Sequence, residues 1–214
     1  MPGMAARRHS AGRGASLRII AGRWRGRRIP LPGDAPVRPT GDRIRETLFN
    51  WLMPVVHDAR CLDLFAGTGA LGLEALSRGA ASATFVERDA GAAENLYQSL
   101  ERFGARNAVV HCADALRYLQ GTPGAFDIVF LDPPFDGGDF ENLCTLLDNG
   151  WLAPEARVYM EMSRDRAVPV LPEGWSVMRD RKAGKVRYLL AVAGDATGRR
   201  QTAHADRRDV SGDI

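Results

Sequence analysis

The chain has 214 residues, of which 45% are hydrophobic and 26% are charged, and this predicts a globular protein with one substantial core. It contains no run of roughly 18 apolar residues that could span a membrane, and its basic N-terminus lacks the apolar stretch of a secretory signal. We therefore expect a cytoplasmic protein without membrane contacts. Cys61, Cys112 and Cys144 are widely spaced and match no metal-ligand pattern, so we expect reduced thiols and no metal site.

Positive charge is concentrated at the N-terminus. Residues 1–45 contain eleven arginines and two aspartates, a net charge of +9, so the other 169 residues carry −6 of the chain's total of +3. A basic arm on a mildly acidic body is typical of proteins that bind polyanions. This distribution favours a nucleic acid as partner, with a merely solvated tail as the alternative.

The first elements in chain order belong to this basic region. Residues 1–15 have no apolar periodicity and are predicted to form a disordered tail. The apolar runs at 17–21 and 28–31 predict a short arginine-rich hairpin with Trp24 at its turn. A helix is predicted to start near Thr40, whose hydroxyl can cap it, and to end at Pro54. We assign residues 16–54 to an N-terminal extension.

From residue 60 onward, strand and helix patterns alternate. Strands are predicted at 60–65, 82–87, 107–111, 126–131 and 157–162, and helices at 70–78, at 90–103, from 114 and from 140. This alternation requires a doubly wound, mainly parallel sheet. Residues 175–181 and 186–192 predict a closing hairpin, which adds an antiparallel edge. We therefore expect one α/β domain at 55–193 and a disordered tail at 194–214.

A glycine-rich segment, Asp63-Leu-Phe-Ala-Gly67-Thr-Gly69-Ala-Leu-Gly72, follows the first strand of this alternation and opens a helix. The glycines permit a tight turn close to a ligand, and the helix N-terminus offers free N–H groups. Glu87 stands twenty residues after Gly67, where an acid that binds ribose belongs. The pattern predicts a nucleoside-containing ligand; a purely structural turn is the alternative. A P-loop is excluded because no Gly-Lys-Ser/Thr follows.

Two further acidic positions follow predicted strands. Asp114 begins a helix, so its carboxylate can cap that helix, accept the amino group of an adenine, or do both. Asp132-Pro133-Pro134-Phe135 follows the strand at 126–131, at the edge of the sheet where ligands bind. Asp132 and the Pro133 carbonyl can accept both hydrogens of a planar amino group, while Phe135 stacks on its ring. Such acceptors stabilise the positive charge that develops when the nitrogen attacks. A Pro-Pro turn without chemistry is the alternative.

These motifs resemble those of the class I, Rossmann-like S-adenosylmethionine methyltransferases, in which Asp-Pro-Pro-Phe is the variant used on exocyclic base nitrogens. With Arg38-Pro39-Thr40-Gly-Asp-Arg43-Ile-Arg45-Glu46-Thr-Leu48-Phe49-Asn50 added, the chain from about residue 17 to about residue 192 resembles the RsmD family of bacterial 16S rRNA (guanine-N2)-methyltransferases. The resemblance implies methyl transfer from S-adenosylmethionine to N2 of a guanine in 16S rRNA. It also implies an assembled or assembling 30S subunit as the substrate, and a monomeric enzyme.

The resemblance also assigns site residues. The cofactor is expected to contact Asp63, Phe65, Gly67, Gly69, Glu87, Arg88, Asp114, Ala115 and Asp132. The target guanine is expected to contact Asp132, Pro133 and Phe135. The RNA is expected to contact Arg18, Arg23, Arg25, Arg27, Arg28, Arg38, Thr40 and Arg43. Among these, Asp63 would orient the cofactor's amino group, Glu87 would bind its ribose, and Asp114 and Ala115 would meet its adenine.

Several alternatives stay open at this point. An adenine-N6 methyltransferase acting on DNA or RNA uses the same catalytic loop. The glycine spacing also allows a small NAD(P)-dependent oxidoreductase, although that class explains neither the Asp-Pro-Pro-Phe loop nor the basic arm. A non-enzymatic RNA-binding protein could retain the fold. The segment 38–45 is expected to close over the cofactor or to contact RNA; a packed helix with solvated arginines is the alternative.

Overall fold

The computed structural model describes residues 16–31, 39–134 and 138–194. The predicted tails at 1–15 and, beyond Gly194, at 195–214 lie outside these ranges, as do Arg38 and Phe135. No helix in the described part of the chain is both long and apolar enough to cross a membrane.

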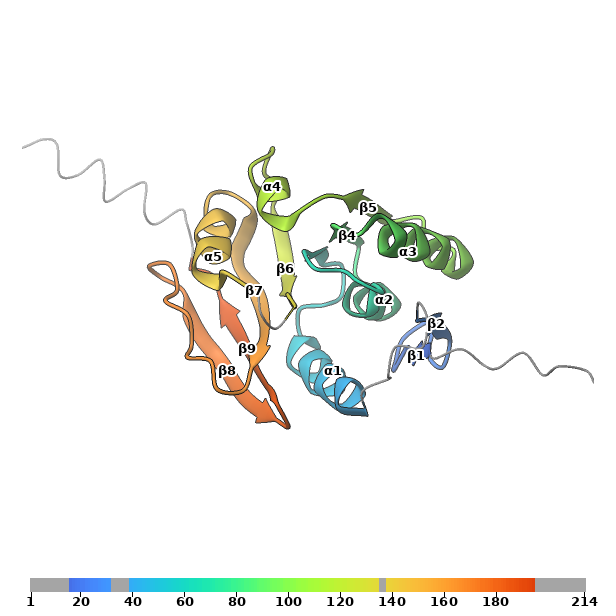
Figure 1. The fold of residues 1–214 in the computed structure, drawn as a ribbon, viewed down its shortest axis with the longest axis horizontal. Coiled ribbons are helices and arrows are strands. Elements are labelled where there is room, and N and C mark those ends of the chain that lie inside the picture. Colours follow the sequence, from blue (N-terminus) through green and yellow to red (C-terminus); the bar gives the residue numbers. More distant parts are fainter. Residues whose placement is uncertain (1–15, 32–38, 135–137, 195–214) are drawn as a thin grey trace, which may run out of the picture.

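A seven-stranded sheet with the order β5-β4-β3-β6-β7-β9-β8 forms the centre of the fold (Figure 1). Its strands are β3 (Arg60–Asp63), β4 (Ser82–Glu87), β5 (Ala108–Cys112), β6 (Phe126–Leu131), β7 (Leu152–Ser163), β8 (Ser176–Ala183) and β9 (Val186–Val192). The five strands from β5 to β7 pair in parallel, whereas β9 runs antiparallel to both β7 and β8. The predicted doubly wound sheet with an antiparallel edge hairpin is therefore confirmed.

Strand β7 is longer than the sequence pattern indicated. It begins at Leu152 rather than at residue 157, and its pairing with β6 changes register between Phe126 and Ile128. Glu155 has a φ of 56° inside this irregular stretch. Because a register shift interrupts the alternation of inward and outward residues, periodicity could detect only the regular second half of the strand.

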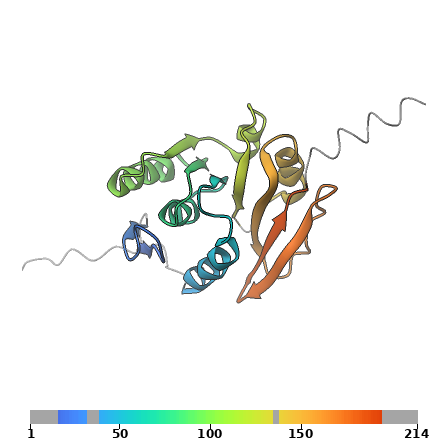
Figure 2. The ribbon, with the colours of Figure 1, turned by 180° about the vertical axis from the view of Figure 1, so that it is seen from behind.

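Five helices of the described residues cover the two faces of the sheet (Figures 1 and 2). They are α1 (Pro39–Leu52), α2 (Ala70–Ser77), α3 (Ala90–Phe103), α4 (Ala115–Leu119) and α5 (Phe140–Asp148). Alternate residues of a strand point to opposite faces, so in β6 Phe130 packs in the core with α1, α2 and α3, while Leu131 packs in the core with α4 and α5. Both faces of the central strands are thus buried, as parallel sheets require.

Aspartates start three of these helices. The side chains of Asp89, Asp114 and Asp139 accept backbone N–H groups at the N-termini of α3, α4 and α5. Helix α2 instead follows Gly69, which has a left-handed conformation and provides no side-chain cap. Helix α1 starts at Pro39, one residue before the predicted Thr40, because proline is well suited to a first helical position.

The predicted N-terminal hairpin is confirmed as β1 (Ser16–Arg18) paired antiparallel with β2 (Arg28–Pro30). Trp24 lies in its turn, as expected, and is buried with its ring 5.1 Å from that of Phe103 on α3. The hairpin therefore shares the core with α1, α2 and α3.

The first hairpin strand ends earlier than residue 21 because its backbone turns to α2. The amides of Ile20 and Ala21 donate to the carboxylate of Glu74 at 2.7 and 3.0 Å, and Arg23 N donates to Ser77 O at 2.8 Å. Glu74 is fully buried and also accepts from Arg78 at 2.8 Å. A buried acidic side chain in a mainly apolar helix thus attaches the basic hairpin to the domain.

Candidate active site

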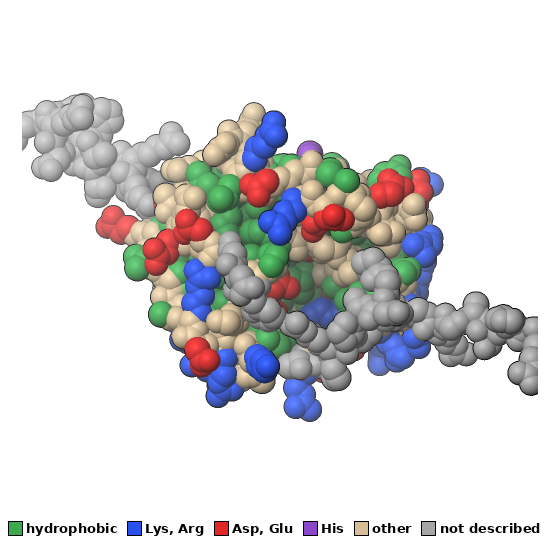
Figure 3. Space-filling view, viewed as in Figure 1, with side chains coloured by type: hydrophobic (Ala, Val, Ile, Leu, Met, Phe, Trp, Pro, Cys, Tyr) green, Lys and Arg blue, Asp and Glu red, His purple; other side chains and the backbone are tan. Residues whose placement is uncertain are grey.

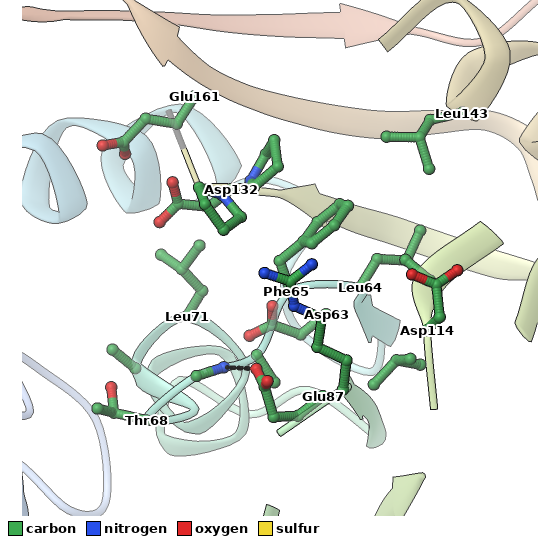
Figure 4. Close-up of a pocket in the computed structure, with 18 of the residues that line it drawn as sticks. Asp63, Leu64, Phe65, Thr68, Leu71, Glu87, Asp114, Asp132, Leu143 and Glu161 are labelled. Carbon is green, nitrogen blue, oxygen red and sulfur yellow. Dashed lines mark hydrogen bonds between the residues drawn. The ribbon is translucent and has the colours of Figure 1, made fainter. Parts of the chain in front are cut away.

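A cavity of about 720 Å³ lies at the carboxyl ends of β3, β4 and β6, and Figure 4 shows many of its lining side chains. Its volume is in the range of small-molecule and cofactor sites. Most residues that were predicted to contact the cofactor line this cavity, namely Asp63, Phe65, Gly67, Glu87, Arg88, Asp114, Ala115 and Asp132. Pro133, predicted to hold the base, lines it as well. Parallel strands thus bring together residues from motifs up to seventy positions apart.

The three glycines of the turn have different surroundings. Gly67 has a φ of 50°, and a Cβ atom built on it would meet no atom within 4 Å, so its backbone faces open space in the cavity wall. A Cβ on Gly69 would come within 2.3 Å of Leu96 on α3, and one on Gly72 within 2.2 Å of Phe85 on β4. Gly69, expected to make room for the cofactor, is not among the lining residues and instead permits close packing beneath the turn.

Glu87 is fixed by the backbone on both of its oxygens. Its Oε2 accepts from Gly67 N at 2.8 Å, drawn as a dashed line in Figure 4, and its Oε1 accepts from Asp89 N at 2.8 Å. A carboxylate can accept about four hydrogen bonds, so these two leave it able to accept from hydroxyl groups in the cavity. The sequence predicted the position of Glu87 but not its contact with the glycine turn.

Asp63 is almost completely buried beneath the turn. Its Oδ2 accepts from Gly72 N at 3.2 Å, whereas its Oδ1 has no hydrogen-bond partner among the described residues. The pKa of Asp63 is raised from 3.8 to about 7, chiefly by burial and in smaller part by the negative charge of Glu87, while backbone hydrogen bonds from Gly72 and Phe65 oppose the rise. Such a carboxyl group is suited to receive a cationic ligand group.

Arg45 is a site residue that the sequence analysis did not assign individually. It lies on α1, is only 6% exposed, and lines the cavity. Its Nη2 donates to Asp42 at 2.6 Å and to Arg18 O at 2.8 Å, while its Nε and Nη1 find no partner in the part of the chain that the structure describes. Its spacing of three, four and seven residues from the buried Leu48, Phe49 and Leu52 is the signal that could have identified an inward-facing arginine.

Asp114 has the capping role that the sequence left open. Its Oδ1 accepts from Leu116 N at 3.0 Å and from Arg117 N at 3.1 Å, so it caps α4. Its side chain also lines the cavity next to the buried Ala115. The capping interpretation is therefore confirmed, and a contact with a ligand at the same position stays a prediction.

Two carboxylates face the cavity from adjacent strands. Leu131, the last residue of β6, pairs with Met160 on β7, so Asp132, the first residue after β6, lies beside Glu161, which is still within β7 and pairs with Tyr188 on β9. Figure 4 shows their side chains in the same part of the cavity wall. Tyr159 donates a hydrogen bond of 2.8 Å to Glu161, and burial together with the charges of Glu161 and Asp132 raises the Tyr159 pKa well above its usual value. Glu161 was not predicted as a site residue, because no motif in the sequence marks it.

The arginines predicted to contact RNA lie mainly on the hairpin surface. Arg18, Arg23, Arg25, Arg27, Arg28 and Arg43 are exposed, whereas Arg38 and the side chain of Thr40 lie outside the described residues. The guanidinium groups of Arg23 and Arg27 lie over the rings of Trp24 and Phe103, at 4.1 and 4.3 Å. Figure 3 shows Arg and Lys side chains along the lower edge and on the side nearest the hairpin. Leu17 lines the cavity, so the hairpin borders it.

Within the described ranges, no group of three His, Cys, Asp or Glu side chains is arranged to hold a metal ion. Cys61 and Cys144 are buried, Cys112 is exposed, and all three are free. None of them lines the cavity.

Comparisons with known proteins identify the family of the chain. The family model described as Conserved hypothetical protein 95 matches residues 17–192. Ribosomal RNA small subunit methyltransferase D of Escherichia coli (strain K12) is 51% identical over 177 residues, covering 81% of this chain and 88% of that protein. The protein of the same name from Haemophilus influenzae is 45% identical over 180 residues, covering 81% and 92%. The solved structure of yhhF from Escherichia coli has a TM-score of 0.79 at 48% identity, covering 84% of this chain and 99% of that one.

Proposed function

This chain belongs to the RsmD family of S-adenosylmethionine-dependent methyltransferases, and from that premise we propose that it methylates N2 of one guanine in 16S ribosomal RNA. The observation that carries the proposal is the cavity, which Asp132 and Pro133 line together with the glycine turn, Glu87 and Asp63. A methyl donor and the amino group that receives the methyl can thus bind in the same cavity.

The buried polar atoms of the cavity fit the methionyl group of the cofactor. That group is a zwitterion with one ammonium and one carboxylate. Asp63 Oδ1 and the Nε and Nη1 atoms of Arg45 are buried and lack partners among the described residues. A buried polar group without a partner costs about 1–3 kcal/mol, and a bound zwitterion would satisfy a group of each sign. We propose that Asp63 binds the ammonium and Arg45 the carboxylate.

The rest of the cavity supports binding of the nucleoside part. We propose that Glu87 accepts from the ribose hydroxyls, since its two backbone hydrogen bonds hold it rigidly at the turn. Asp114 and Ala115 would meet the adenine, and Phe65 and Arg88 would contribute further contacts. Gly69 would act indirectly, by allowing the turn to pack against Leu96.

For the chemical step, the chain supplies alignment and hydrogen-bond acceptors. When bound, S-adenosylmethionine supplies a methyl group activated by its positively charged sulfur. N2 would take this methyl group from the sulfur and would lose one of its two protons. Asp132 and the Pro133 carbonyl accept the amino hydrogens and stabilise the charge that develops on nitrogen. Asp132 is exposed and can pass the released proton to solvent. We propose that Phe135, outside the described residues, stacks on the base.

We propose that the exposed arginines of the extension 16–54 bind RNA phosphates, while residues 55–193 form the methyltransferase domain. Phosphate contacts supply affinity and orientation with little sequence information. The target guanine must leave its stack, or already be unpaired, for N2 to reach the cavity. We further propose a monomeric enzyme that acts on an assembled or assembling 30S subunit.

Methyl transfer tests this proposal. Tritiated S-adenosylmethionine is supplied with 30S particles, deproteinised 16S rRNA and DNA in parallel, and the products are digested to nucleosides for mass spectrometry. We expect N2-methylguanosine in small-subunit RNA, at a higher level with particles than with deproteinised RNA. N6-methyladenosine as the product, or DNA as the preferred substrate, would contradict the proposal.

A further inference from the structure

We infer that Glu161 selects guanine as the target base by accepting a hydrogen bond from its N1–H while Asp132 holds the adjacent N2 amino group. The inference rests on the proposed function and adds the residue that determines which base is accepted. It concerns a side chain that no motif of the sequence marks.

The placement of Glu161 is set by the sheet. Parallel strands lie about 4.8 Å apart, and the pairing of Leu131 with Met160 puts Asp132, the first residue after β6, next to Glu161 on the neighbouring strand β7. Both side chains line the cavity, and both are directed into the same part of it in Figure 4. A planar base held by Asp132 therefore presents its neighbouring edge atoms toward Glu161.

The orientation of Glu161 is set by Tyr159. These two residues are two positions apart on β7, so their side chains lie on the same face of the strand, and the tyrosine hydroxyl donates to Oε2 of Glu161 at 2.8 Å. Tyr159 is fully buried in the core with α1–α3, and its pKa is raised first by burial and then by the charges of Glu161 and Asp132. The phenol therefore stays protonated and keeps Glu161 positioned as an acceptor.

The hydrogen-bonding edges of the two purines make this arrangement selective. Guanine presents N1–H and the N2 amino group as adjacent donors, which suits two adjacent carboxylates. Adenine presents its amino group next to an N1 lone pair, so a carboxylate facing N1 would meet another acceptor and lose its hydrogen bond. A site built to hydrogen-bond a group rejects analogues that lack it far more strongly than an apolar pocket can.

The test uses a base that retains the methylated group and lacks N1–H. The methylated position is first mapped, and 16S rRNA is then assembled into particles with either guanosine or 2-aminopurine at that position. We expect the wild type to prefer guanosine in kcat/KM by on the order of a hundredfold or more. In Glu161→Gln, whose amide can donate to the N1 lone pair of 2-aminopurine, we expect this preference to fall by more than tenfold.

Two controls separate selection from a merely structural role. Glu155→Gln changes an exposed glutamate on the same strand and should leave the preference unchanged. Affinity of Glu161→Gln for S-adenosylhomocysteine, measured by calorimetry, should stay within about twofold of the wild type, because Glu161 is assigned to the base. Tyr159→Phe, which removes only the positioning hydroxyl, should lower the preference for guanosine in the same direction as Glu161→Gln.

Three outcomes would overturn the inference. A wild type that methylates both bases equally, or a Glu161→Gln variant that loses activity on both by the same factor, removes its basis while leaving the proposed function intact. Loss of S-adenosylhomocysteine binding in Glu161→Gln would assign the residue to the cofactor instead. A wild type that forms no N2-methylguanosine would reject the proposed function itself.

Discussion

The amide of Gly67 donates a hydrogen bond of 2.8 Å to Oε2 of Glu87, which joins the glycine turn after β3 to the acidic residue at the end of β4. Two contacts that the sequence suggested separately are thus one structural unit. A change at Glu87 removes the acceptor that we assign to the ribose. It also removes the hydrogen bond that holds Gly67 in the turn.

We therefore expect Glu87→Ala to weaken binding of S-adenosylhomocysteine by about ten- to a hundredfold, which corresponds to the loss of hydrogen bonds worth about 1–3 kcal/mol. Glu87→Gln should lose less, because its amide oxygen can still accept from Gly67. Isothermal calorimetry measures both, with the exposed Glu94→Gln as the control. Unchanged affinity in Glu87→Ala would remove the assignment of this residue to the cofactor.

The roles of Arg45 and Asp63 can be tested by comparing two ligands. Methylthioadenosine shares the nucleoside of S-adenosylhomocysteine but lacks its ammonium and carboxylate. We expect Arg45→Met and Asp63→Asn each to reduce the preference for S-adenosylhomocysteine by tenfold or more, because each removes one partner of the zwitterion. Calorimetric titration with both ligands gives the ratio. Equal weakening of both ligands by either variant would contradict that variant's assignment.

Cofactor binding should release a proton below pH 7. The pKa of Asp63 is raised to about 7 without ligand, and a neighbouring ammonium would favour the ionised form. Near pH 6 we expect binding of S-adenosylhomocysteine to release close to one proton, and near pH 8 almost none, because Asp63 is already ionised there. Titrations in buffers of different ionisation enthalpy measure the number released. Asp63→Asn should abolish the difference between the two pH values.

The same carboxyl group should affect stability in the absence of ligand. Between its ordinary pKa of 3.8 and about 7, the folded state holds a proton at Asp63 that the unfolded state has released. Stability from this group is therefore present at low pH and lost as the pH rises toward 7. Urea unfolding across this range should show a shallower fall in Asp63→Asn than in the wild type. If the free energy of unfolding depended on pH in the same way in both proteins, the pKa of Asp63 would not be raised in the folded state.

The exposed arginines should contribute to RNA binding through charge alone. For Arg25→Gln we expect weaker binding of 16S rRNA and a salt dependence reduced by about one unit of slope, the effect of one phosphate contact. Affinity for S-adenosylhomocysteine should not change. Arg106→Gln, an exposed arginine that follows α3, is the matched control. A binding curve with the same salt slope as the wild type would show that Arg25 is merely solvated.

Most of the α/β domain could be predicted because its signals are local. The elements β4, α3, β6 and β9 have the predicted ends, since strands rich in apolar and β-branched residues are marked off by turn residues and Asp89 and Gly104 cap α3. Gly67, Glu87, Asp114 and Asp132 all line the cavity, because motifs at strand ends are brought together by any parallel sheet.

What the sequence could not predict depends on long-range pairing. Glu161 reaches the cavity because of the register in which β7 pairs with β6, and no local sequence pattern predicts that register. Glu74 carries no motif in the sequence, yet it receives backbone amides from a segment more than fifty positions earlier. The packing role of Gly69 depends on Leu96, a residue of α3 twenty-seven positions later, which leaves no room for a side chain at Gly69.

The attachment of the hairpin to Glu74 and Ser77 has a consequence for protein engineering. Basic RNA-binding arms are commonly treated as cassettes that can be deleted or transferred to another catalytic domain. Deleting this one would open the core at Ile19, Trp24 and Ile29 and would leave a buried carboxylate without its backbone donors. The arm is therefore not modular, and its charge is better altered one exposed arginine at a time.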